Sequence, residues 1–177
     1  SEAIRLDPNR AVFFYNRGAA HANKRQDDRA IADYSEAIRL DPNFAWAFYN
    51  RGRAYSAKGQ HDRAIVDYSE AIRLDPNHAA FFFNRGVSHS IKSQYDRAIA
   101  DYSEAIRLDP NDARVFNNRG AAYFDKGEYG RAIADYSEAI RLDPNFALAF
   151  RNRGVAYRRL GRTDRAMADF EQADKLE

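Results

Sequence analysis

The nonapeptide Ser-Glu-Ala-Ile-Arg-Leu-Asp-Pro-Asn occurs five times without change, and each copy starts 34 residues after the previous one. A fixed period of this length means that one supersecondary unit is copied in tandem and that each unit packs mainly against its neighbours. Fold and function must therefore be argued by position within the repeat. The copies occupy residues 1–9, 35–43, 69–77, 103–111 and 137–145.

Each unit has the pattern of two helices joined by a short turn. In the second unit we expect the first helix over about Ala45–Lys58 and the second over about Asp62–Leu74. Pro76 cannot continue the second helix because it lacks an N–H and clashes with the preceding turn. Asn77, which follows it, is expected to be the N-cap of the next helix. Gly59 suits the turn between the helices.

Apolar residues lie three and four positions apart in both helices, which predicts one buried stripe on each. Ala64, Tyr68 and Ala71 belong to this stripe in the second helix. Gly52 lies in the first helix and recurs in every unit. Glycine inside a helix costs about 1 kcal/mol, so its repetition indicates that the two helices approach closely there.

With positions counted from Ala45, the unit has an aromatic residue at 4, Gly at 8, Tyr at 11, Ala at 20, Tyr at 24, Ala at 27 and Pro at 32. This pattern resembles the tetratricopeptide repeat over the whole chain. The resemblance implies an all-α fold, a right-handed superhelical solenoid of stacked antiparallel helix pairs whose first helices line the concave face. The residues that carry it in the second unit are Phe48, Gly52, Tyr55, Ala64, Tyr68, Ala71 and Pro76.

The period divides the chain into five repeats and the end of an earlier one. We interpret residues 1–10 as the tail of the second helix of a truncated preceding repeat. Asp174 replaces the isoleucine of the other units, and this polar substitution predicts that the array finishes close to Glu177. The five repeats are 11–44, 45–78, 79–112, 113–146 and 147–177.

Position 7, where the family pattern has leucine, is arginine in all five units, and an aspartate recurs 16 residues later. An unpaired charge is very costly at a helix–helix contact. We therefore expect an Arg–Asp pair within each unit, for example Arg51 with Asp67. The alternative is that these arginines bind an anionic ligand.

Position 6 is asparagine in every unit, and the resemblance places it on the concave face. An amide side chain has both a donor and an acceptor, so a row of them can bind the backbone of an extended peptide whatever its sequence. The alternative is that each asparagine caps or bridges neighbouring helices. The ladder consists of Asn16, Asn50, Asn84, Asn118 and Asn152.

Other concave positions change along the array. Tyr15, Tyr49, Phe83 and Trp46 give the first three units an aromatic groove floor, and aromatic residues are common interface anchors. Packing between adjacent units is the alternative for these rings, above all for Trp46. The fifth unit instead has Arg151, Arg158 and Arg159, which predict a basic pocket.

Composition excludes several classes of function. The chain has no cysteine, and its four histidines show no metal-ligand spacing on one helix face. No nucleophile–base pair and no glycine-rich phosphate loop is present, so we expect neither enzymatic activity nor a cofactor. The net charge of +2 argues against a general nucleic-acid or membrane binder.

We therefore predict a protein-interaction scaffold that binds an extended peptide in the concave groove, with apolar ligand residues over the first three units and acidic ones over the fifth. An architectural or self-assembling solenoid without a peptide ligand is the main alternative, and single-stranded RNA binding is a weaker one. Uncapped ends predict head-to-tail self-association. The style of repeat resembles bacterial family members, and we expect a cytoplasmic protein.

Overall fold

The computed structural model describes residues 10–177, and within them the chain forms ten helices and no strand. The expected end of an earlier repeat falls almost wholly on residues 1–9, outside the described residues. Consecutive helices are α2 (Ala11–Asn23), α3 (Asp27–Leu40), α4 (Ala45–Ala57), α5 (His61–Leu74), α6 (Ala79–Ile91), α7 (Tyr95–Leu108), α8 (Ala113–Asp125), α9 (Tyr129–Leu142), α10 (Ala147–Arg159) and α11 (Thr163–Leu176).

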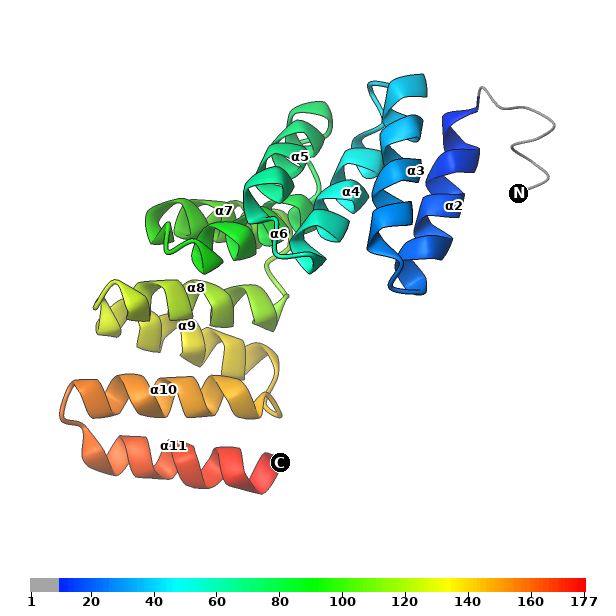
Figure 1. Cartoon of the computed structure of the whole chain (residues 1–177). Coiled ribbons are helices and arrows are strands. Elements are labelled where there is room, and N and C mark those ends of the chain that lie inside the picture. Colours follow the sequence, from blue (N-terminus) through cyan, green and yellow to red (C-terminus); the bar gives the residue numbers. More distant parts are fainter. Residues whose placement is uncertain (1–9) are drawn as a thin grey trace. The chain divides into compact units, whose positions relative to one another are not determined.

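The chain divides between Lys92 and Ser93 into two compact units. In the N-terminal unit α2 packs on α3 and α4 on α5, and α6 follows on α5. In the C-terminal unit α8 packs on α9 and α10 on α11, as antiparallel neighbours that can be followed in Figure 1. The fold is therefore the all-α arrangement of stacked helix pairs that the period predicts.

The helix ends follow from local chemistry, and one expectation about them was wrong. The first helices begin at the predicted alanines, but the N-cap of α6 is His78 rather than Asn77. The N–H of Asn77 donates to Oδ1 of Asp75 at 3.3 Å. Aspartate side chains commonly hold a turn in this way. The Asp-Pro-Asn sequence is thus a turn that leads into the next helix.

Close approach of the two helices explains the glycine at position 8. A Cβ atom on Gly52 would lie 2.8 Å from Cε1 of Tyr68, closer than such contacts occur. Tyr68 is itself almost completely buried between Ala64 and Ala71 on α5. The aromatic ring therefore occupies the space that a side chain at position 8 would need.

The arginine at position 7 joins the helices within a repeat and also joins adjacent repeats. Arg51 donates from Nε and Nη2 to the two carboxylate oxygens of Asp67, at 2.8 and 2.7 Å, and from Nη1 to Ser35 at 3.1 Å. Its guanidinium also lies over the ring of Phe48, 5.6 Å from the centroid. The same bidentate pair with a serine of the preceding repeat occurs at Arg119 with Asp135 and Ser103, and at Arg153 with Asp169 and Ser137.

The serine of the repeated nonapeptide has a defined role in this network. Ser103 accepts from Arg119 and donates to the carbonyl of Ile99 at 2.7 Å, so the hydroxyl is used in both directions. The hydrogen bond with Asp135 raises the pKa of Arg119 above its ordinary value, against the opposing effect of burial. The expected Arg–Asp pair is confirmed in these repeats, and it accounts for a charged residue where the family pattern has leucine.

Candidate functional site

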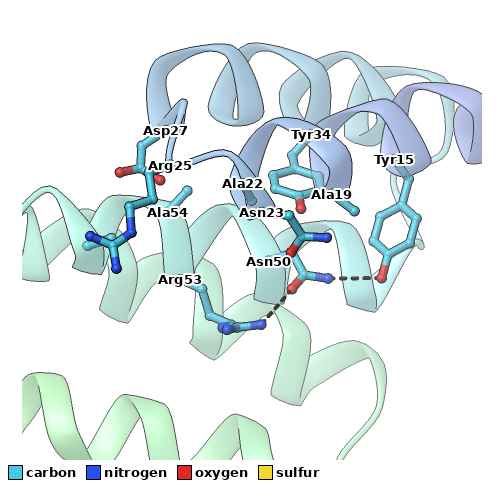
Figure 2. Close-up of a pocket in the computed structure, with 11 residues that line it drawn as sticks. Tyr15, Ala19, Ala22, Asn23, Arg25, Asp27, Tyr34, Asn50, Arg53 and Ala54 are labelled. Carbon is cyan, nitrogen blue, oxygen red and sulfur yellow. Dashed lines mark hydrogen bonds between the residues drawn. The ribbon is translucent and has the colours of Figure 1, made fainter.

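A pocket of about 570 Å³ opens between α2 and α4 in the N-terminal unit (Figure 2). Its volume falls within the usual range for ligand pockets, about 300–1,000 Å³. The first helices α2 and α4 supply most of its lining, and Asp27 and Tyr34 come from α3. Its lining consists of Tyr15, Ala19, Ala22, Asn23, Arg25, Asp27, Tyr34, Asn50, Arg53, Ala54 and Ala57.

Small residues form the pocket because alanine stands at positions where most other units have larger side chains. Ala19 and Ala22 come from α2 and Ala57 from the end of α4. Their methyl groups leave room between the helices, and their backbone is fixed by the helical hydrogen bonds. The pocket thus combines an apolar floor with space for an inserted chain.

Polar groups surround this floor. Arg53 is exposed on α4, and Asn23, Arg25 and Asp27 lie at the turn between α2 and α3. Arg25 has a φ of +56°, in the left-handed region where the second, fourth and fifth repeats have glycine. This conformation belongs to the turn, and Arg25 contributes its side chain to the pocket lining from it (Figure 2).

Asn50 lies between the aromatic and the basic side of the pocket. Its Nδ2 donates to the hydroxyl of Tyr15 at 2.9 Å, and its Oδ1 faces Nη1 of Arg53 at 3.5 Å (Figure 2). The bond to Tyr15 fixes the orientation of the amide. One N–H of Asn50 has no partner among residues 10–177, and its oxygen has only the long contact with Arg53.

Three members of the asparagine ladder, Asn50, Asn84 and Asn152, bond to the preceding repeat, whereas Asn118 accepts from its neighbour Asn117 at 3.4 Å. Asn84 donates to the hydroxyl of Tyr49 at 3.0 Å and to the carbonyl of Ala80 at 2.8 Å, so both of its amide protons are used. Asn152 donates to Oδ1 of Asn117 at 3.0 Å. These three amides are therefore held between repeats, and they differ in which of their N–H and C=O groups remain unbonded. Of the remaining two, Asn16 is exposed and Asn118 is half-buried.

The aromatic residues of the predicted groove floor are packed against neighbours and differ in how far they are exposed. Tyr49 is only 8% exposed, and burial raises the pKa of its hydroxyl. Trp46 is 38% exposed and lies edge-on to Tyr49, His78 and Phe81, with ring centroids 5.0 to 5.4 Å apart. Tyr15 and Phe83 are half-buried. Trp46 is thus fixed by its neighbours and still presents part of its ring.

The arginines predicted to form a basic pocket in the last repeat differ from one another. Arg151 donates from Nη2 to Asp174 and to Glu177, both at 3.0 Å, so its charge is compensated within the chain. Arg158 and Arg159 are exposed at the end of α10. Only these two of the three retain uncompensated charge.

Two further kinds of site are relevant to the described residues, a metal centre and a membrane span. Residues 10–177 contain no cluster of three or more His, Asp or Glu side chains placed to hold a metal ion. Over the same range no helix combines the length and apolar character that crossing a bilayer requires.

Sequence reasoning missed Arg25, Asp27 and Tyr34 as pocket residues. Arg25 and Asp27 lie at the turn and Tyr34 lies on α3, whereas the search for a groove followed the first helices alone. A signal was present, because Arg25 occupies the place of Gly59 in the next repeat. A bulky residue at a turn position that favours glycine is uncommon and therefore worth inspecting.

Family models match most of the chain. The model described as TPR repeat matches residues 26–59, 91–127 and 120–161. Models described as tetratricopeptide repeat match residues 45–78, 68–100 and 150–177. No curated protein sequence matches the chain.

Solved structures with a similar fold include two named proteins. MamA is 27% identical with a TM-score of 0.87, and the match covers 90% of this chain and 93% of that one. YrrB, described as a TPR protein with an unusual peptide-binding site, is 24% identical with a TM-score of 0.87, over 99% and 91% of the two chains. A MamA fragment from Desulfovibrio magneticus RS-1 is 22% identical with a TM-score of 0.89, over 94% of each chain.

Proposed function

The chain belongs to the tetratricopeptide-repeat family, and from this premise we propose that it is a protein-interaction scaffold that binds an extended peptide across its first helices. The observation that carries the proposal is the pocket between α2 and α4, with an alanine floor and a polar rim. Extended chains need both elements, because side chains require space and the backbone requires hydrogen-bond partners.

Asn50 is the residue that we assign to the peptide backbone. Its amide is oriented by Tyr15 and retains a free N–H and most of its acceptor capacity. A peptide carbonyl can accept from the N–H and a peptide N–H can donate to Oδ1. Each such bond contributes about 0.5–1.5 kcal/mol. Asn84, whose protons are both used, can only accept through its oxygen.

Arg53 and Trp46 extend the proposed site along α4. The exposed guanidinium of Arg53 suits a carboxylate or a backbone carbonyl of the peptide. The exposed part of Trp46 suits an apolar side chain and needs little ordering on binding, because its neighbours already fix the ring. The peptide-binding description of YrrB, a protein of the same fold, supports the proposal.

Peptide selection followed by calorimetry tests this function. Peptides selected from a random displayed library against the whole chain are titrated into wild type and into Ala57→Phe, which fills the pocket. We expect micromolar binding, about −8 kcal/mol, and at least a tenfold loss in the variant.

A matched pair of arginine substitutions controls for charge. Arg53→Ala removes a charge from the pocket on α4, and Arg63→Ala removes one from α5 in the same repeat. We expect Arg53→Ala to weaken binding and Arg63→Ala to leave it within about twofold. Equal loss in both, or selected peptides that bind Ala57→Phe as tightly as wild type, would refute the proposed site.

A further inference from the structure

The turn between α10 and α11 has an unusual concentration of positive charge. Arg158 and Arg159 end α10, and Arg162 and Arg165 lie at the start of α11, all four exposed. Leu160 lies between them and is 42% exposed. These five residues are called the arginine turn below.

The other four repeats have a hydrogen-bond acceptor where the arginine turn has Arg162. In each of them the arginine three residues later donates to that acceptor, and in the fourth repeat the acceptor is a carboxylate that also compensates the charge. In the last repeat the acceptor is replaced by a second cation and Arg165 loses its partner. The four pairs are Arg29 with Gln26 at 3.5 Å, Arg63 with Gln60 at 3.0 Å, Arg97 with Gln94 at 3.3 Å and Arg131 with Glu128 at 2.7 Å.

The ion pair that joins adjacent repeats is also missing at this turn. In the second, third and fourth repeats a lysine pairs with an aspartate of the preceding repeat, as Lys126 does with Asp96 at 2.6 Å. At the corresponding positions of the last junction stand Leu160 and Gly130. The glycine removes the nearby carboxylate, and the leucine places an exposed aliphatic side chain among the arginines.

The arginines are oriented but not neutralised. The guanidinium of Arg158 lies over Phe170 and that of Arg165 over Tyr157, both 5.7 Å from the ring centroid. Among the described residues no ion pair or side-chain hydrogen bond reaches the four guanidinium groups. Stacking on a ring leaves the N–H edge of a guanidinium open for a carboxylate.

We propose that the arginine turn binds an acidic peptide segment that carries an aliphatic residue. Carboxylates of the segment would pair with Arg162 and Arg165, and its aliphatic side chain would contact Leu160. Charge complementarity favours this partner, because four cations within eight residues face a single carboxylate, that of Asp164. The site lies at the turn of the last repeat and does not depend on the pocket between α2 and α4.

The geometry favours a peptide over a single-stranded nucleic acid. Binding to bases relies on aromatic faces on which they stack. At this turn the rings of Tyr157 and Phe170 already carry Arg165 and Arg158. An exposed leucine provides no stacking surface, but it suits an aliphatic side chain.

Fluorescence anisotropy with a labelled peptide of glutamates around one leucine tests the proposal on the whole chain at physiological salt. We expect saturable binding that weakens at least roughly tenfold in the Arg162→Gln/Arg165→Gln variant, since it loses two charge-assisted hydrogen bonds. Arg162→Gln restores the residue type of the first three repeats, so the variant should fold, and circular dichroism checks this.

The control variant carries the same charge change one repeat earlier, as Lys126→Gln/Arg131→Gln. It should bind the acidic peptide within about twofold of wild type, and a peptide with glutamines in place of the glutamates should not bind. Equal weakening in both double variants would overturn the proposal, because the attraction would then be non-specific. Binding of oligouridine RNA at the arginine turn without binding of the peptide would also overturn it.

Discussion

Arg51, at position 7, has its guanidinium contacted on three sides, by Asp67, by Ser35 and by the ring of Phe48. Removing it leaves the aspartate buried without its partner. Asp67 has a side chain only 4% exposed. An unpaired buried carboxylate is among the most destabilising changes that a single substitution can make. The alternative role in binding an anionic ligand is not needed to explain these residues.

We predict that Arg51→Ala lowers the free energy of unfolding by about 2–4 kcal/mol. Arg73→Ala is the control, since Arg73 pairs with Glu70 on the surface of α5, where such pairs are worth at most about 1 kcal/mol. Urea denaturation measures both variants. Equal stability of Arg51→Ala and wild type would show that the network contributes nothing.

The buried tyrosines give a prediction about pH. Burial raises the pKa of Tyr34 to about 12 and raises the pKa values of Tyr49, Tyr68 and Tyr136 as well. In the unfolded chain these hydroxyls ionise near pH 10. Their contribution to stability is complete below about pH 10 and is lost as the pH rises through the folded-state pKa values. We expect phenolate absorbance of these four residues to appear only together with alkaline unfolding; their ionisation in the folded chain would contradict this.

At the scale of elements, the turn within each repeat requires a left-handed residue. Gly59, Gly127 and Gly161 supply it in three repeats, and Arg25 and Ser93 adopt the same conformation in the others. A side chain in this region costs about 1–2 kcal/mol. Glycine is therefore not obligatory at the turn, but its replacement has a cost in stability.

We predict that Ser93→Gly stabilises the chain by about 1 kcal/mol, because it relieves this strain. The reverse change, Gly59→Ser, should destabilise by a similar amount. Thermal melts of the two variants measure these changes in stability. A lower melting temperature for Ser93→Gly would mean that its hydroxyl contributes more than the backbone strain costs.

Adjacent repeats are also joined by the lysine–aspartate pair, which the last junction lacks. Gly130→Asp together with Leu160→Lys recreates it between α9 and α10. We expect the gain in free energy of unfolding of the double variant to exceed the sum of the gains of the two single variants. The excess should be about 0.2–1 kcal/mol, the usual value for an exposed pair. A double-mutant cycle by urea denaturation measures this coupling. Strict additivity would show that the pair does not form.

At the scale of the whole molecule, the repeat period predicted the fold well. It gave the start of α4 at Ala45 and the end of α5 at Leu74, as found. Hydrophobic spacing and proline determine these features locally. The N-cap expectation was wrong because Asn77 still belongs to the Asp-Pro-Asn turn, one residue before the N-cap His78.

The candidate site was less predictable, because contacts between distant residues decide it. Position 6 was expected to offer free amides, but Asn84 uses both protons on Tyr49 and Ala80. Arg151 was expected to carry a free charge, but Asp174 and Glu177 compensate it from 23 and 26 residues away. No local pattern reveals such pairings, since they depend on how the helices pack.

Amide chemical-shift mapping with a peptide from the selection experiment tests the central claim most directly. The account predicts that the largest shift changes lie on α2 and α4, around Ala22, Asn50 and Arg53, with little change on the outer surfaces of α3 and α5. Changes concentrated on α3 and α5, with none at Asn50 or Arg53, would contradict peptide binding across the first helices.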